Sequence, residues 1–525
     1  MQVFMTLATL LSWISTTSSG PDLSASHSIP VWEVLDITFH ANTDHPYNQT
    51  FGADLTGPES QKIRIPGFYN GYGQWVIRFS ANQGGNWEFS TFSSTPQLSG
   101  HKGQIQVTEN PDRNKHGAIV INRDKPRQFY YEDGEPYHTL AFECDWLFAL
   151  DYGDTSLTKT NHLIDQVRAN GFNQIVMNVY AYDVDWKKDP KLQEEHDFSR
   201  PRVFLFWGTN EKPDYSGLNV AFFQHFDRVM ELLHEKNMVA HLMIYVWNKR
   251  VNWPEANSVA DNRYFDYVLA RYQAFPNIIW DVSKEALGYG HTDVHYISDR
   301  IDRIRRQDGY NRLVTVHDFD YCSRFPEKVD FISIQTWASD LYANMVRIRS
   351  EYPDKPVFNI EHGGYERSPY VVFEGDYTDP QVCLRRNYAC MFAGTYSTYY
   401  WQGASWYVIV DEPFSRRVKP NPEWGYFKHM QDLMQRYSFD QLTPVAGCSS
   451  SGWCLSNGDG LHLIYVYGDN YAIHATTRKR GNEAGKISWF NTLTGEYRRQ
   501  ADQSWQSWQE FKAPWRDVDC ILILE

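Results

Sequence analysis

Two glutamates, Glu285 and Glu361, each stand directly after an apolar run with strand character. Glu285 ends the segment NIIWDVSKE, and Glu361 ends the segment VFNIE. Two carboxyl groups can cleave a glycosidic bond when one protonates the leaving oxygen and the other attacks the sugar or activates water. Aromatic side chains nearby would exclude water and help to keep the acid protonated. Either glutamate alone could simply form an ion pair, so a catalytic pair requires that both reach one site.

The elements that would bring these glutamates together are eight apolar segments, most of them separated by amphipathic helices. The segments are 139–142, 174–180, 241–247, 277–283, 313–317, 331–335, 357–361 and 395–401. Such an alternation predicts a (β/α)8 TIM barrel over residues 118–440, with a connection between the fifth and sixth strands too short for a full helix. The carboxyl ends of all eight strands meet at one face of a barrel. We therefore expect Glu285, after the fourth strand, to lie opposite Glu361, after the seventh.

Further polar and aromatic residues follow the predicted strands and would line the same face. Aromatic rings can stack on the apolar faces of sugars, and polar groups can bind sugar hydroxyls. A structural role explains Asp145, Glu143, His317 and His362 about as well. The predicted substrate-binding residues are Asp145, Trp146, Asn178, Tyr182, Trp247, Lys284, His317, Gln335, Trp337, His362 and Trp401.

The sequence pattern at both ends of the chain differs from that of the central region: short segments alternate apolar and polar residues, and many turn residues separate them. Residues 30–108 predict a small β-sandwich, and the polar, turn-rich stretch 109–117 predicts a linker. Residues 441–525 again alternate and predict a second β-sandwich that packs against the barrel. The expected fold class is therefore α/β, a TIM barrel flanked by N-terminal and C-terminal β-sandwiches.

The barrel motifs resemble those of apiosidase-like glycoside hydrolases, relatives of a large clan with its acid/base after strand 4 and its nucleophile after strand 7. NIIWDVSKE matches the first motif and KPVFNIEHGGYE the second. The resemblance implies that Glu285 is the acid/base, that Glu361 is the nucleophile, and that the anomeric configuration is retained. It also implies that Trp401 is a platform for the sugar at the cleavage point. The segment GFYNGYGQWVIRFSANQGGNWEFSTFSS resembles the β-sandwich that often precedes such barrels, and KISWFNTLTGEY resembles a C-terminal domain type named for collagen binding.

Lys284 departs from the clan pattern, in which an asparagine that binds the sugar 2-hydroxyl precedes the acid/base. A lysine there could form an ion pair with Glu285 or another carboxylate, or it could contact an anionic substrate. An ion pair at the barrel rim is at least as plausible an interpretation as a substrate contact. Lys284 does not change the assignment of Glu285, but the contact to the sugar 2-hydroxyl must differ from the clan pattern.

Composition excludes several classes of protein. The 525 residues carry 50 Lys and Arg against 64 Asp and Glu, a formal net charge of −14, which disfavours a nucleic-acid partner. No later segment is an uninterrupted apolar run long enough for a membrane span, and the G-x-S-x-G motif of serine hydrolases is absent. The acidic motifs YDVDW and HDFDY lack the full ligand spacing of a calcium loop, so we expect neither a metal nor another cofactor.

The N-terminal segment and two of the cysteines indicate where in or outside the cell the protein is located. An apolar run from Phe4 to Ile14, followed by small residues up to Gly20, predicts a cleaved signal peptide over residues 1–20, although it lacks a preceding Lys or Arg. A secreted or periplasmic location follows from it. Cys448 and Cys454, in the loop CSSSGWC, are the best candidates for a disulfide.

Together these patterns predict a secreted glycoside hydrolase, retaining in mechanism, that acts on a polysaccharide or its oligosaccharides. Two alternatives stay open: a non-catalytic carbohydrate-binding barrel, and a polysaccharide lyase, which would use a Tyr, His or Lys base. The sequence does not define the sugar, the linkage, the endo or exo mode, or the oligomeric state.

Overall fold

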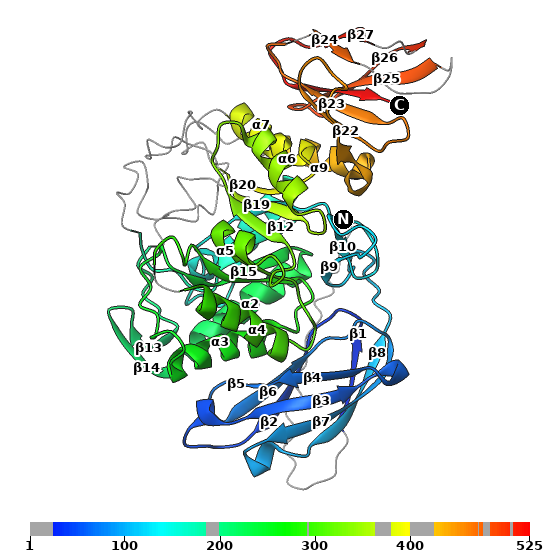
Figure 1. The fold of residues 1–525 in the computed structure, drawn as a ribbon. Coiled ribbons are helices and arrows are strands. Elements are labelled where there is room, and N and C mark those ends of the chain that lie inside the picture. Colours follow the sequence, from blue (N-terminus) through cyan, green and yellow to red (C-terminus); the bar gives the residue numbers. More distant parts are fainter. Residues whose placement is uncertain are drawn as a thin grey trace, which may run out of the picture.

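The computed structural model describes residues 25–184, 199–290, 293–362, 380–399, 425–470, 472–475, 484–504 and 508–525. Three bodies follow one another along the chain: a strand-rich N-terminal domain, a central α/β body and a strand-rich C-terminal domain (Figure 1). The predicted signal peptide (1–20), Asp185 and Trp401 lie outside the described residues.

The N-terminal domain consists of two sheets that enclose one apolar core. Its strands alternate buried and exposed residues, as in β8, because successive side chains point to opposite faces of a sheet. Trp75 and Trp87 fill the core between the sheets. The first sheet has the order β1 (Ala25–Pro30), β8 (Lys102–Thr108), β7 (Gly85–Ser93), β3 (Phe51–Thr56), β4 (Lys62–Pro66), and the second has the order β2 (Leu35–His40), β6 (Gln74–Phe79), β5 (Phe68–Tyr69).

The central body contains eight strands in one almost closed barrel, as the sequence predicts. Neighbouring strands pair in parallel, and β17 lies beside β18 at the seam, where the Thr315 hydroxyl is 3.0 Å from that of Ser333 and the Asp330 amide donates to the Val314 carbonyl at 2.8 Å. The strands are β11 (Leu140–Glu143), β12 (Gln174–Asn178), β15 (Val239–Val246), β16 (Ile278–Lys284), β17 (Val314–His317), β18 (Ile332–Gln335), β19 (Val357–Glu361) and β20 (Tyr396–Tyr399).

Helices surround this barrel, and several begin where a side chain caps the free amides of the first turn. Asn219, Ser258, Asp293 and Asp318 each accept a hydrogen bond from a backbone amide at such a position. The helix between the fifth and sixth barrel strands, α5, is short, as expected. The helices are α1 (Thr158–Ala169), α2 (Val220–Glu235), α3 (Val259–Tyr272), α4 (Val294–Gln307), α5 (Phe319–Arg324), α6 (Leu341–Glu351), α7 (Pro380–Phe392) and α9 (Gly425–Arg436).

Two β-hairpins form small sheets outside the barrel sheet. One, β9 (Ile119–Ile121) with β10 (Phe129–Tyr131), precedes the first barrel strand. The other, β13 (Phe206–Thr209) with β14 (Lys212–Leu218), lies in the long connection from β12 to α2 and stands at the edge of the molecule in Figure 1. Because it follows the carboxyl end of β12, it belongs to the same face of the barrel as the predicted site.

The C-terminal domain has a main sheet and a two-stranded sheet, which share an apolar core around Trp489. Cys448 and Cys454 form a disulfide next to this core, and the cysteines at 144, 322, 383, 390 and 520 are buried. The main sheet has the order β21 (Thr443–Pro444), β22 (Trp453–Ser456), β23 (His462–Val466), β28 (Cys520–Leu524), β25 (Ala484–Asn491), β26 (Tyr497–Ser504), and the small one pairs β24 (Ala472–Ala475) with β27 (Gln509–Lys512).

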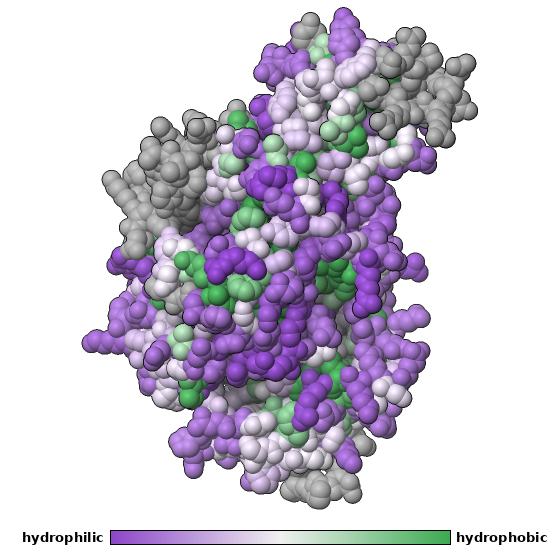
Figure 2. Space-filling model, in the orientation of Figure 1, coloured by the Kyte–Doolittle hydropathy of each residue, from purple (hydrophilic) through white to green (hydrophobic). Residues whose placement is uncertain are grey.

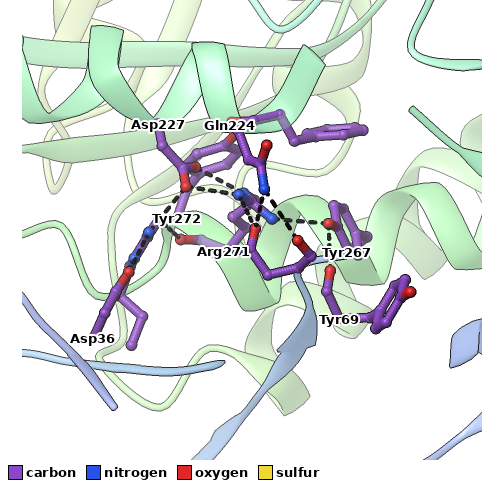
Figure 3. A network of polar contacts seen from close by, with 10 residues as sticks. Asp36, Tyr69, Gln224, Asp227, Tyr267, Arg271 and Tyr272 are labelled. Atoms are coloured by element: carbon purple, nitrogen blue, oxygen red, sulfur yellow. Dashed lines mark hydrogen bonds and ion pairs between the residues drawn. The ribbon is translucent and has the colours of Figure 1, made fainter. Parts of the chain in front are cut away.

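A buried charge network joins the N-terminal domain to the barrel (Figure 3). Arg78 on β6 forms an ion pair with Asp36 at 2.7 Å and reaches Asp227 of α2 at 3.0 Å. Asp227 also pairs with Arg271 of α3 at 2.7 Å, and Arg271 in turn donates to the Tyr267 hydroxyl at 2.8 Å. Arg78 and Arg271 are 3% and 0% exposed. Each domain thus contributes an ion pair to one shared network, and Arg78 connects the two pairs.

The surface shown in Figure 2 is mainly hydrophilic, with small and separate hydrophobic areas. Within the described ranges, no helix combines the length and the apolar character that a membrane crossing requires.

Candidate active site

Glu285 and Glu361 meet at the carboxyl ends of the barrel strands. Glu285 directly follows β16, and Glu361 is the last residue of β19. One carboxylate oxygen of each, together with a ring nitrogen of His317, lies within 4.8 Å of the others. The residues that sequence spacing placed on opposite strands thus share one site.

The backbone around Glu285 has an unusual conformation that aims its side chain. Its φ of +57° lies in the left-handed region, which costs a non-glycine residue roughly 1 kcal/mol or more. The pairing of β16 with β17 shifts register at this point, between Asp281 and Lys284. Asp281 holds the irregularity in place, because its Oδ1 accepts the amides of Ser283 at 3.1 Å and His317 at 2.9 Å. Sequence patterns give no sign of this strain.

Asn248, just beyond β15, fixes the carboxyl group of Glu285. Its Nδ2 donates to Glu285 Oε2 at 2.6 Å. Glu285 is partly exposed, whereas Glu361 is only 4% exposed. The two carboxyls therefore differ in their access to solvent.

Lys284 occupies the centre of a buried cluster of carboxylates. Its Nζ lies 2.5 Å from Glu143 Oε1, 3.3 Å from Glu361 Oε2 and 3.7 Å from Asp145 Oδ2. The side chain is 1% exposed. These contacts favour the ion-pair interpretation of Lys284 over contact with an anionic substrate.

Lys249 is a second buried cation, which the sequence analysis missed. Its Nζ lies 3.1 Å from Asp145 Oδ2, and Asn178 donates to Asp145 Oδ1 at 3.0 Å. All three side chains are at most 1% exposed. The position of Lys249, shortly after the third predicted strand, is the signal that could have found it.

Burial and charge together determine how these carboxyls ionise. Burial raises the pKa of Glu361 to about 7; Lys284 opposes this rise, and Glu285 adds to it. Burial also raises the pKa of Glu143 well above its usual range. The pKa of Asp145 is lowered, because Lys284 and Lys249 outweigh its own desolvation. Burial and the two lysines thus shift the pKa values of Glu143 and Asp145 in opposite directions.

His317 is a neutral imidazole at the edge of the pair. Burial, followed by the charge of Lys284, lowers its pKa well below 6.5. Its Nε2 lies 3.9 Å from Glu361 Oε2, and neither ring nitrogen has a hydrogen bond of normal geometry among the described residues. Asn248 Oδ1 is likewise buried and unpaired in that part of the chain. Unpaired polar atoms beside two carboxyls are what a hydroxyl-rich ligand would satisfy.

The other predicted residues lie at different depths. Trp247, Gln335 and Tyr182 are partly exposed, Trp337 is 9% exposed, and Gln335 pairs with Glu361 in the β18–β19 register. Trp146 is fully buried and packs beside Phe148, so it is part of the barrel core.

His362 lies against the surrounding helix. Its Nε2 is 3.3 Å from Asn387 of α7, whereas the preceding residue, Glu361, lies beside Glu285 and His317. Burial lowers the pKa of His362 to about 3. These contacts favour its structural interpretation.

The same three side chains, Glu285, His317 and Glu361, have the spacing of metal ligands. Lys284 Nζ, however, already lies 3.3 Å from Glu361 Oε2 and would repel a cation. The donor set suits an acid–nucleophile pair better than a metal ion.

The described carboxylates of the acidic motifs YDVDW and HDFDY have other partners. Asp183 pairs with Arg200 at 2.5 Å, and Asp320 pairs with Arg324 at 3.2 Å. Asp318 caps α5.

A barrel of eight parallel strands with two facing carboxyls, after its fourth and seventh strands, defines a glycoside hydrolase type of protein. The comparisons with known proteins agree. A family model described as the Apiosidase-like catalytic domain matches residues 123–439, and a model described as a domain of unknown function, DUF5060, matches residues 28–94. The chain therefore belongs to the Apiosidase-like family and is a glycosidase.

One of three similar solved structures, the first named here, shares the fold of this chain. A candidate glycoside hydrolase from Bacteroides vulgatus is 19% identical, with a TM-score of 0.77 over 95% of this chain and 100% of that chain. A family 5 mannosidase from Rhizomucor miehei is 13% identical, with a TM-score of 0.42 over 60% and 99% of the two chains. A maltogenic α-amylase from Thermotoga neapolitana is 8% identical, with a TM-score of 0.44 over 73% and 98%. No curated protein matches the sequence.

Proposed function

We propose that this glycosidase is a secreted, retaining enzyme that cleaves glycosidic bonds in a polysaccharide or its oligosaccharides. The observation that supports retention is the approach of Glu285 and Glu361, whose nearest oxygens lie within 4.8 Å. Carboxyls of retaining enzymes stand about 5–5.5 Å apart, whereas inverting enzymes keep roughly 6.5–9.5 Å for a water molecule.

The environments of the two carboxyls support their assignment. Glu361, buried and next to Lys284, is the nucleophile, because the ammonium favours its carboxylate form against the burial that raises its pKa to about 7. Glu285, partly exposed and held by Asn248, is the acid/base, because it must reach both the leaving oxygen and the incoming water.

The reaction then proceeds in two steps. Glu285 gives its proton to the glycosidic oxygen while Glu361 attacks the anomeric carbon, so the bond to the leaving group breaks and a glycosyl ester forms. The ester carries no charge, so it no longer repels a negative charge on Glu285. Glu285 can now take a proton from water, which attacks the anomeric carbon and restores Glu361.

The surroundings of Lys284 oppose the lyase alternative. A lysine base must be neutral, but neighbouring carboxylates raise the pKa of Lys284 well above 10.5 despite its burial. Its ammonium is also occupied by Glu143 and Glu361.

The test is a screen of purified enzyme against plant, algal and microbial polysaccharides, with sizing of the products. NMR spectroscopy of the first product formed should show the anomeric configuration of the substrate. An inverted product would contradict the retaining mechanism, and an unsaturated uronate at the new chain end would indicate a lyase.

Secretion is supported by the apolar run from Phe4 to Ile14 and by the Cys448–Cys454 disulfide, a bond typical of oxidising compartments. Expression of the full chain in a secreting host should release enzyme whose N-terminal sequence begins near residue 21. Retention of uncleaved protein inside the cells would contradict this proposal.

A further inference from the structure

Trp207 is a large aromatic side chain that the site does not use. It lies on β13, in the hairpin of the long β12–α2 connection, and is 50% exposed. Its indole ring lies flat over Gly217 of β14, because a Cβ added to that glycine would come within 2.5, 2.6 and 2.7 Å of Cε2, Cζ2 and Cδ2 of the ring. One face of the ring therefore covers backbone, and the opposite face is available to solvent.

The neighbours of Trp207 on the hairpin are polar. Trp207 pairs with Asp214, and Thr209 pairs with Lys212, so these four side chains share one face of the hairpin. Asp214, Thr209 and Lys212 are all exposed. A single ring surrounded by a carboxylate, a hydroxyl and an ammonium is too small an apolar area for a stable protein interface. It matches one sugar ring, with an apolar C–H face and hydroxyls at its rim.

The hairpin is fastened to the rim of the active site. The hydroxyl of Tyr182 donates to Glu211 at the hairpin turn, and the amide of Tyr182 donates to the Lys249 carbonyl at 3.1 Å. Asn210 Nδ2 donates to the Arg250 carbonyl at 3.1 Å, and Asn210 Oδ1 accepts the Asn252 amide at 2.9 Å. The segment that holds the hairpin is thus the one that begins with Asn248 beside Glu285.

We propose that Trp207 is a platform that stacks on a sugar ring of a glycan chain, at a position away from the bond that is cleaved. Asp214 and Lys212 would bind the hydroxyls of that ring. The contribution of this platform to catalysis rests on the proposed function, because only a long glycan bound at the active site would also reach Trp207. A short substrate would not.

The experiment compares Trp207→Ala with the wild-type enzyme in native gels that contain each polysaccharide of the panel. Trp508→Ala is the matched control, since Trp508 is 52% exposed but lies in the C-terminal domain. We expect at least one polysaccharide to retard wild type and Trp508→Ala, and Trp207→Ala to lose this retardation. For that polysaccharide KM should rise about tenfold in Trp207→Ala, while hydrolysis of an aryl monoglycoside stays unchanged.

Gly217→Ala provides a second variant that keeps the indole but tilts it, because the new methyl group would collide with the ring. It should lose retardation as Trp207→Ala does, with an unchanged circular dichroism spectrum, and Trp207→Tyr should keep much of it. Unchanged retardation in Trp207→Ala, an equal loss in Trp508→Ala, or a wild type that no polysaccharide retards would overturn the proposal. A further outcome is that a polysaccharide retards the wild type but not Trp207→Ala, while no polysaccharide of the panel is hydrolysed. This result would support the platform and contradict the proposed polysaccharide substrate.

Discussion

The two carboxyl groups of the site differ most in what surrounds them, and substitution separates their roles. With Glu361 as nucleophile, Glu361→Ala should abolish turnover of every substrate, because no glycosyl ester can form. Glu285→Ala should impair substrates with poor leaving groups most, since an activated aryl glycoside needs little protonation. Rates on a matched pair of such substrates measure the difference.

Added azide gives the control for this assignment. In Glu285→Ala, azide should intercept the ester and yield a glycosyl azide of retained configuration, whereas in Glu361→Ala it should attack from the vacated side and yield the inverted azide. The opposite pattern would exchange the two roles. Near-wild-type activity in both variants would place the catalytic site elsewhere.

The raised pKa of Glu361 predicts the pH dependence. Glu361 must be an anion to attack, and its pKa of about 7 means that kcat/KM for an activated aryl glycoside should fall as pH drops through about 7. Glu285→Gln removes a neighbour that raises this pKa and should move the midpoint to lower pH. Lys284→Met removes a neighbour that lowers it and should move the midpoint to higher pH. A midpoint near 4.5 that neither substitution moves would contradict the electrostatic coupling.

Among the elements, the turn from α1 into β12 depends on a glycine. Gly171 has a φ of +92°, and a Cβ there would lie 2.7 Å from the Lys428 Cα and 2.9 Å from the Phe427 carbonyl of α9. Gly171→Ala should therefore lower the free energy of unfolding by about 1 kcal/mol for the backbone conformation and by about 1–3 kcal/mol more for the collision, measured by urea denaturation.

Gly153 is the matched control for this prediction. Its φ is +88°, but a Cβ there would meet nothing within 4 Å. Gly153→Ala should lower the free energy of unfolding only by the contribution of the backbone conformation, about 1 kcal/mol. Equal losses in the two variants would show that α9 moves aside without cost.

The barrel strands could be predicted because parallel strands buried on both faces are continuous apolar runs. All eight expected segments overlap a barrel strand, and one of them, 357–361, coincides with β19. The β13–β14 hairpin was not predicted, because half of its residues are exposed and KPDYSGL lacks an apolar alternation. Buried barrel strands can thus be predicted from the sequence, whereas an exposed hairpin outside the barrel sheet cannot.

The candidate site divides in the same way. Glu285 and Glu361 could be predicted from their places at strand ends, which the barrel topology translates into proximity. The roles of Lys249, Asn248 and the left-handed backbone at Glu285 depend on side-chain directions and on a register shift that no periodicity encodes.

At the level of the whole molecule, the buried network between the N-terminal domain and the barrel predicts that the two unfold together. Asp227→Ala would leave Arg78 and Arg271 buried without their shared carboxylate, so it should lower the free energy of unfolding by about 3–5 kcal/mol. Differential scanning calorimetry should show one lowered transition for both domains.

The control for this substitution is Asp432→Ala on α9. Asp432 pairs with Lys428, and both side chains are about half exposed, at 49% and 48%. Its loss should change the free energy of unfolding by at most about 0.5 kcal/mol. A loss as small for Asp227→Ala would mean that water replaces the network and that the domains are only loosely joined.

The Arg78 guanidinium also donates to the Arg271 carbonyl at 2.9 Å, so the N-terminal domain completes the end of a barrel helix. A different β-domain at this position would have to supply its own donor for the Asp227 carboxylate and for the Arg271 carbonyl. Asp227 and Arg271 would still pair with each other, but the hydrogen bonds that Arg78 now donates to them would be missing. The barrel is therefore fitted to the particular β-domain that precedes it.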